Sequence, residues 1–316
     1  MVNQTRVFNE EYVQINGIQQ YFLHYPASPD NEVMLIIHGG PGQSEAPFAY
    51  YTERETSEIT SVFYDQRGAG KTLRKNPTNG KDITPSQLIA DLVETVEYIK
   101  KKYCKKKIIL SGHSWGSILG LQYTHKHPDN ILFYVGAGQI VNMVKGEKEI
   151  FDRLKNAAKN NTVDSQKLER ITDYPNGVVS SRDFKAVMKT ITKMKKKYGM
   201  ELNMKKIQKI ALKSPHFGFA DIVAMIRAEK INRPLMEYIS TFNVEDVTDY
   251  QVPMYFVHGV EDFQVPVSPV REYLATINAP DKELFIIPDA GHICNIDNQE
   301  GTLSAMREIF NRHRII

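Results

Sequence analysis

The first half of the chain alternates short apolar runs with segments of helical periodicity. Apolar runs of strand length, typical of strands buried on both faces, lie at residues 33–38, 60–64, 107–110 and 131–135. Two segments between them, 84–99 and 117–127, are predicted to be helical; the first opens on Thr84-Pro85 and the second stops before Pro128. This alternation predicts an α/β fold, in which a mostly parallel sheet carries helices on both faces.

Both ends of the chain add to the predicted sheet. Residues 11–25 form two alternating runs around Asn16-Gly17, which predicts an antiparallel hairpin with a tight turn. After Asp249 the apolar runs return at residues 254–258 and 284–287, and residues 302–313 predict a closing helix. The sheet is therefore expected to take strands from both halves of the sequence.

The middle of the chain differs in pattern and in charge. From residue 141 to residue 242 the apolar residues recur at helical spacing, and no segment predicts a strand. We therefore expect a catalytic sheet domain at 1–140 and 246–316 that is interrupted by a helical cap at 141–245. Residues 145–213 hold 18 basic against 8 acidic residues, so the rest of the chain carries −7 of the net charge of +3. This basic region is interpreted as a solubilising surface or as one that attracts acidic substrates or an anionic surface.

The strongest chemical motif follows the predicted strand at 107–110. Residues 112–116 (GHSWG) match G-x-S-x-G, with a helix directly behind them. A strand-to-helix elbow strains the central residue and exposes its hydroxyl, and the flanking glycines avoid collision with the neighbouring turn. The pentapeptide alone can be an ordinary glycine-rich turn, but this context predicts Ser114 as a nucleophile.

A nucleophilic serine needs a base and an acid that orients the base. In folds that carry the serine on such an elbow, the acid comes after the serine in the sequence and the histidine comes last. The strand at 254–258 runs into Glu261 and Asp262, and the strand at 284–287 runs into His292. Both segments lie beyond the carboxyl ends of strands, where open α/β sheets place ligands. Asp262 is predicted as the acid and His292 as the base, with Glu261 as the rival of Asp262.

The glycine-rich segment after the first buried strand, residues 38–42 (HGGPG), is the expected oxyanion loop. Glycines let the backbone approach a substrate carbonyl, so the Gly40 N–H can pair with the Trp115 N–H as an oxyanion hole. A simple turn is the alternative interpretation. His38 is expected to pack structurally inside the turn.

Other function classes lack support in the sequence. Residues 68–72 (GAGKT) miss the phosphate-loop spacing because its first glycine falls on Asp65, and no dinucleotide fingerprint is present. The lysine runs at 105–107 and 195–197 have only scattered aromatic residues between them, so nucleic-acid binding is not expected. No metal or organic cofactor is expected, because a catalytic triad needs none.

Compartment and membrane signals are also weak. No stretch reaches the roughly 20 apolar residues that a membrane span needs, and no secretory signal is visible. Cys104 and Cys294 lie far apart without CxxC spacing, so they are expected to remain reduced, which favours a cytoplasmic protein.

Three motifs together resemble the prolyl iminopeptidase family of α/β-hydrolases: residues 38–42 (HGGPG), 64–70 (YDQRGAG) and 112–117 (GHSWGS). The resemblance implies the α/β-hydrolase fold and a serine aminopeptidase that removes an N-terminal residue, favouring proline, from short peptides. It also implies a helical cap over the site and an oxyanion hole made by Gly40 and Trp115.

Acidic residues that hold the free α-amino group of the substrate, partly from the cap, are a further implication of the resemblance. Glu201, Glu229 and Glu237 are available in the middle region, and Glu229 in the apolar helix 222–229 is our candidate. Some members of the family carry a Glu directly after the triad Asp, a position that is Phe263 in this chain.

Two other functions stay open. A carboxylesterase or other amidase would use the same triad on small esters or amides, and a binding protein would keep the fold without catalysis. The intact triad argues against the binding protein. The expected partner is therefore a small peptide, amide or ester substrate.

Overall fold

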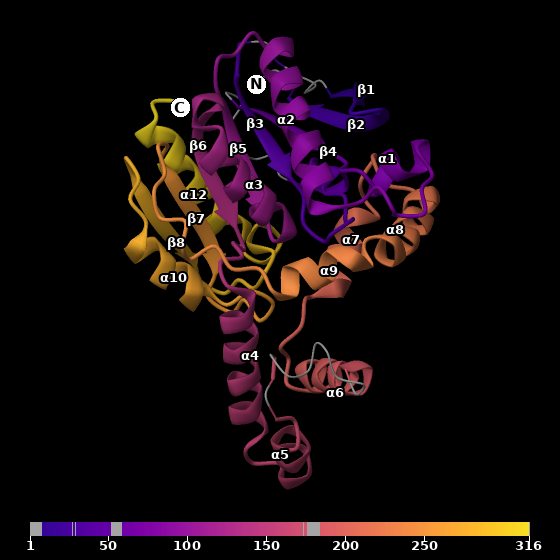
Figure 1. The fold of residues 1–316 in the computed structure, drawn as a ribbon, viewed down its shortest axis with the longest axis vertical. Coiled ribbons are helices and arrows are strands. Elements are labelled where there is room, and N and C mark those ends of the chain that lie inside the picture. The colour runs from indigo at the N-terminus through magenta and orange to yellow at the C-terminus, as the bar shows by residue number, and fades with distance from the viewer. Residues whose placement is uncertain are drawn as a thin grey trace.

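The computed structural model describes residues 8–26, 28, 30–51, 59–172, 174–175 and 184–315. Its centre is an eight-stranded sheet in the order β1-β2-β4-β3-β5-β6-β7-β8 (Figure 1). The strands are β1 Asn9–Ile15, β2 Ile18–Tyr25, β3 Glu32–Ile37, β4 Ile59–Tyr64, β5 Ile108–His113, β6 Ile131–Ala137, β7 Met254–Gly259 and β8 Lys282–Ile287. The hairpin β1–β2 and the pair β2–β4 are antiparallel, and all other pairs are parallel. The predicted hairpin and the mostly parallel sheet are confirmed.

Helices cover both faces of this sheet. They are α1 Gly70–Lys75, α2 Pro85–Lys102, α3 Trp115–Lys126, α10 Val267–Thr276, α11 Cys294–Asp297 and α12 Gln299–Arg312, with the short 3-10 turns η1 Ala46–Phe48 and η2 Pro128–Asn130. One buried cluster joins the sheet to α2, α3 and α10, through residues such as Val96, Ile118 and Val270. A second cluster joins it to α12, where Phe133 and Phe310 pack. The expectation of helices on both faces is confirmed.

In the described residues between β6 and β7 lie six helices: α4 Met143–Ala158, α5 Thr162–Glu169, α6 Phe184–Lys197, α7 Met204–Ala211, α8 Phe219–Ile231 and α9 Arg233–Ser240. Helices α4 to α6 project from the body around a hydrophobic cluster of their own, and α7 to α9 lie against the body (Figure 1). An ion pair of 2.7 Å between Arg74 and Asp221 ties α8 to the end of α1. We keep the cap at 141–245 as a proposal founded on this arrangement.

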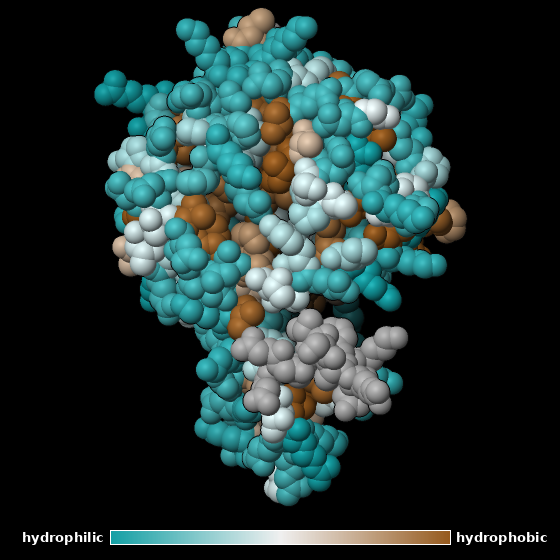
Figure 2. Space-filling view, viewed as in Figure 1, coloured by the Kyte–Doolittle hydropathy of each residue, from teal (hydrophilic) through white to brown (hydrophobic). Residues whose placement is uncertain are grey.

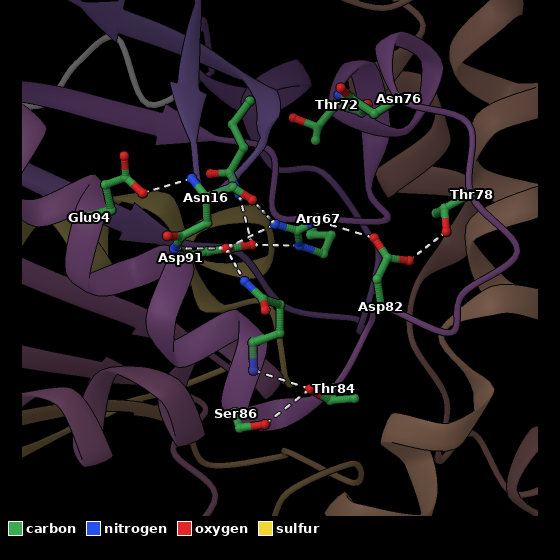
Figure 3. Close-up of polar contacts among 12 residues, drawn as sticks. Asn16, Arg67, Thr72, Asn76, Thr78, Asp82, Thr84, Ser86, Asp91 and Glu94 are labelled. Atoms are coloured by element: carbon green, nitrogen blue, oxygen red, sulfur yellow. Dashed lines mark hydrogen bonds and ion pairs between the residues drawn. The ribbon is translucent and has the colours of Figure 1, made fainter.

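A buried arginine joins the hairpin, the loop after β4 and α2 (Figure 3). Arg67 donates from Nε and Nη2 to the two carboxylate oxygens of Asp91, at 2.8 and 3.1 Å, and also to the Asn16 carbonyl at 3.0 Å. Its Nη1 reaches the half-exposed Asp82 at 3.1 Å. Asp91 accepts further bonds from Asn16, Gln20 and Gln87. This network fixes the 64–70 motif beneath the site.

Asp91→Ala should lower the free energy of unfolding by about 3–5 kcal/mol, because it leaves the buried Arg67 guanidinium without its carboxylate. Asp82→Ala removes the more exposed partner of the same arginine and should cost less than about 1 kcal/mol. Urea unfolding followed by circular dichroism measures both. Equal losses in the two variants would show that the network is not organised around Asp91.

Candidate active site

Ser114 occupies a strained turn between β5 and α3. Its backbone has φ 50° and ψ −117°, a conformation that residues other than glycine rarely adopt. A Cβ on Gly116 would lie 2.0 Å from the Ile37 carbonyl oxygen, and one on Gly112 would lie 2.6 Å from the Gly116 oxygen. Only glycine fits at both positions. The sequence GHSWG therefore folds as an elbow that presents Ser114 at the carboxyl edge of the sheet.

Asp262 and His292 meet beyond the ends of β7 and β8. His292 Nδ1 donates to Asp262 Oδ2 at 2.8 Å, while Asp262 Oδ1 accepts the backbone N–H groups of Gln264 and Val265, both at 2.8 Å. Burial opposes ionisation of this carboxyl, but the neighbouring His292 and His258 hold the pKa of Asp262 well below its usual range. The rival Glu261 is exposed.

His258 is a second imidazole on the same carboxylate, and the sequence pattern gave no sign of it beyond its place at the end of β7. Its Nε2 lies 2.7 Å from the Val265 carbonyl and 3.3 Å from Asp262 Oδ2. The ring is fully buried. Because Nε2 faces two acceptors, it carries the hydrogen, and His258 adds a donor that favours the ionised form of Asp262.

One cavity of about 850 Å³ brings the predicted nucleophile and base together, since Ser114 and His292 both line it. Gly40 and Trp115 line it as well. Gly138 permits the base to sit there, because a Cβ at that position would lie 3.0 Å from His292 Cε1. Asp262 lies behind His292, buried to 1% exposure. The structure thus gathers all five of these predicted residues at one edge of the sheet.

The loop at 38–42 is fixed from behind by the motif at 64–70. His38 is buried, its Nε2 accepts the Gln66 backbone N–H at 3.0 Å, and its carbonyl accepts Gln66 Nε2 at 2.8 Å. Gln66 Oε1 in turn accepts the Trp115 indole N–H at 3.0 Å. These bonds agree with a structural role for His38. They fix the loop where Gly39 lies against the elbow, since a Cβ on Gly39 would be 3.2 Å from Ser114 Cβ, and the next residue, Gly40, has φ 115°.

A second pair of charged side chains, Glu45 and His113, adjoins the elbow. His113 Nδ1 lies 2.6 Å from Glu45 Oε1, and its Nε2 lies 3.2 Å from the carbonyl oxygen of His292. Both partners accept hydrogen bonds, so the two contacts favour a hydrogen on each ring nitrogen, which is the imidazolium form. Burial alone would lower the pKa of His113, but the adjacent Glu45 carboxylate raises it.

The sequence gave no signal for this pair, because His113 occupies the variable position of the serine motif. Glu45 also accepts the Gly39 N–H at 3.1 Å. The Glu45 carboxylate therefore contacts the expected oxyanion loop directly, and it is linked to the His292 backbone through the His113 ring.

Glu229 does not occupy the predicted place. It is exposed on α8 and is absent from the cavity wall. It shares the helical stripe of the cavity-lining Ile222 and Ile226, but it lies about one turn beyond the last of these residues, where the cavity has ended. The carboxylates that do line the cavity are Glu45, Asp65, Glu147 and Asp221. Each has a partner in the structure: His113, the Lys71 backbone N–H, the Tyr174 hydroxyl and Arg74, respectively. Helical periodicity placed Glu229 on a helix but could not tell how far along that helix the cavity extends.

The rest of the cavity wall is mostly apolar. The sheet contributes Met34, Phe63 and Val257, and the helices between β6 and β7 contribute Met143, Ile207 and Ile239. Within the described ranges, no set of three or more His, Cys, Asp or Glu residues is grouped so as to hold a metal ion, and Cys104 and Cys294 are free thiols. None of the described helices has both the length and the apolar character to cross a membrane.

Comparison with known proteins agrees with this architecture. A family model for the alpha/beta hydrolase fold matches residues 32–299. The probable aminopeptidase YbaC of Bacillus subtilis is 23% identical over 298 residues, covering 90% of this chain and 91% of that protein. The proline iminopeptidase of Neisseria gonorrhoeae is 31% identical over 126 residues, which is 39% of this chain and 38% of that protein. The structure of the proline iminopeptidase of Mycobacterium smegmatis superposes with a TM-score of 0.66 at 15% identity, covering 96% of this chain and 98% of that one.

Proposed function

The chain belongs to the α/β-hydrolase fold family, and from that premise we propose that it is a serine hydrolase with Ser114, His292 and Asp262 as its catalytic triad. The observation that carries the proposal is the 2.8 Å bond between Asp262 and His292, formed at a cavity wall that also holds the strained Ser114. The proposal is supported by the chain positions of the three residues, because each follows the carboxyl end of a strand, where open α/β sheets place ligands. A buried carboxylate with a lowered pKa is the partner that an imidazolium needs.

In the proposed reaction, Ser114 Oγ attacks the carbonyl carbon of the substrate while His292 Nε2 takes the hydroxyl proton. The backbone N–H groups of Gly40 and Trp115 stabilise the oxyanion of the tetrahedral intermediate. When the bond to the leaving amine or alcohol breaks, His292 returns the proton to that group, and the acyl group stays on Ser114. A water molecule, deprotonated by His292, then releases the acid and restores the serine.

The first substrate class is short peptides, from which the enzyme would release the N-terminal residue, with proline favoured. The three motifs and the similarity to the probable aminopeptidase YbaC over 90% of the chain support it. An aminopeptidase must hold an α-ammonium group, and the described cap helices offer two carboxylates at the cavity wall, Glu147 and Asp221. Asp221 is already paired with Arg74, whereas Glu147 accepts the neutral Tyr174 hydroxyl. We propose Glu147 for this role in place of Glu229.

The second substrate class is a carboxylic ester with an apolar acyl group. The cavity favours it, because about 850 Å³ is more than a proline residue fills and most of the wall is apolar. Two of the described carboxylates at the wall are already paired with cationic side chains, Glu45 with His113 and Asp221 with Arg74, and the other two accept hydrogen bonds from neutral donors, which leaves fewer acceptor positions for an amine.

Side-by-side turnover of aryl-amides of proline, alanine and leucine and of aryl esters of short and long acids separates these classes. Cleavage of the amides supports the aminopeptidase, whereas cleavage of esters alone removes it. A fluorophosphonate probe should label the protein, and peptide mass spectrometry should locate the label on Ser114. Labelling at a different residue, or none in the folded protein, would contradict the proposed nucleophile.

A further inference from the structure

Exposed apolar side chains gather on the last three helices between β6 and β7. Twelve large hydrophobic side chains are exposed among the described residues, and eight of them lie between residues 204 and 236. We call these eight the apolar rim: Met204, Leu212, Phe219, Ile222, Val223, Met225, Ile226 and Met236. Single exposed apolar residues are ordinary, but a cluster of this size indicates an interaction surface. Figure 2 shows apolar atoms reaching the surface where α8 and α9 lie.

Helix α8 presents its large apolar side chains to solvent and its small ones to the body. Phe219, Val223 and Ile226 follow one another at helical spacing on one face, and all are exposed, Phe219 to 81%. The opposite face buries Ala224 and Ala228. A surface helix normally has the reverse arrangement. Among the described residues, Phe219 and Val223 on this outward face belong neither to the cavity wall nor to a buried hydrophobic cluster.

The apolar rim is continuous with the proposed active site. Six of its eight residues also line the cavity that holds Ser114 and His292, and only Phe219 and Val223 stand wholly outside it. Since these six are both exposed and part of the cavity wall, the rim marks where the cavity meets solvent. The apolar side chains of the rim thus continue into the mostly apolar wall of the cavity.

Basic side chains accompany the apolar rim. Residues 204–236 contain seven Lys or Arg against two acidic residues, and one of the two, Asp221, is already paired with Arg74 at 2.7 Å. The exposed cations are Lys205, Lys209, Lys213, Arg227, Lys230 and Arg233. Large apolar groups beside lysine and arginine are the composition of helices that lie in the headgroup region of anionic bilayers. The same charges oppose a second copy of this chain, because two rims would bring like charges together.

We propose that the apolar rim docks on an anionic lipid bilayer, and that the cavity takes the acyl chain of a lipid ester directly from it. Phe219, Val223 and Ile226 enter the boundary between headgroups and acyl chains, and the surrounding lysines and arginines contact the lipid phosphates. The uptake and hydrolysis of the lipid ester rest on the proposed function as a serine hydrolase of esters, whereas docking on the bilayer does not depend on that function.

The test is flotation of the full-length protein with vesicles of phosphatidylcholine alone and of phosphatidylcholine with phosphatidylglycerol in equal parts. The protein should float with the anionic vesicles and lose binding as salt is raised. The double variant Phe219→Ser, Val223→Ser should bind roughly tenfold more weakly or worse, because it removes two apolar side chains from the lipid boundary. The matched control Val163→Ser, Val260→Ser removes two valines that are 61% and 45% exposed elsewhere, and should bind as the parent does.

Vesicle binding measures docking, and ester cleavage measures hydrolysis, so the two properties are tested separately. The double variant should cleave a soluble short-chain aryl ester at the parent rate but lose roughly tenfold in release of fatty acid from anionic vesicles. Absence of binding to anionic vesicles, or equal binding by the double variant and its control, overturns the docking whatever the esterase result. Concentration-dependent dimerisation that the double variant abolishes also overturns it, in favour of self-association. Vesicle binding by a protein that hydrolyses nothing sustains the docking and refutes the proposed function.

Discussion

Ser114→Ala should lower hydrolysis by about a millionfold, the loss found when the nucleophile of a serine triad is removed. Alanine adds no atom to the elbow, whose strained backbone the flanking Gly112 and Gly116 permit. The fold should therefore be retained, since the Ser114 backbone N–H still donates to the Ala137 carbonyl. Turnover of the best aryl substrate and the thermal unfolding temperature measure the two effects.

Ser268→Ala is the matched control, because it removes a hydroxyl that bonds to Glu149 and takes no part in the cavity wall. It should retain the parent rate. If Ser114→Ala kept more than about a thousandth of the activity, a loss smaller than that from any triad member in a serine protease, the nucleophile would have to be sought elsewhere.

Asp262→Asn should lower turnover by roughly 10⁴-fold, the size of effect known for such a change in a serine triad. The reason lies in the two sides of the carboxylate. Oδ1 accepts the N–H groups of Gln264 and Val265, so the amide oxygen of asparagine must remain on that side. The amide NH₂ would then face His292, which could bond to it only by giving up its Nδ1 hydrogen and moving the proton to Nε2. That tautomer cannot accept a proton from Ser114.

Asp289→Asn is the control for the lost charge. Asp289 is exposed at φ 51°, three residues before His292, and asparagine tolerates this left-handed backbone well. Its activity should stay within a factor of about two of the parent, an effect too small to count as a triad loss. Similar losses in both variants, measured as kcat, would assign the effect to local charge and not to the orientation of the base.

The sequence predicts the sheet well because its parallel strands are buried on both faces and therefore appear as unbroken apolar runs. It does not predict α10, where Pro266 and Pro269 suggest a loop although proline is compatible with a first helical turn. The proposed triad was accessible for a similar reason: each member follows a strand that could be recognised.

The extent of the cavity along the middle helices was not accessible. Glu229 lies on a helix, as expected, and on the same stripe as the cavity-lining Ile222 and Ile226, but the cavity ends before it. Glu45 and His113 escaped notice because their pairing joins the end of β5 to a residue 68 positions earlier in the chain. No local pattern encodes such a contact.

That pairing has a mechanical consequence. One carboxylate holds the Gly39 amide at 3.1 Å and the His113 ring at 2.6 Å, and the ring holds the carbonyl of His292 at 3.2 Å. The wall that would receive a developing negative charge and the segment that would shuttle protons are thereby coupled into a single rigid assembly. Any substrate that pushes one of them displaces the other, so the two halves of the chemistry should stay aligned while the helices above them move.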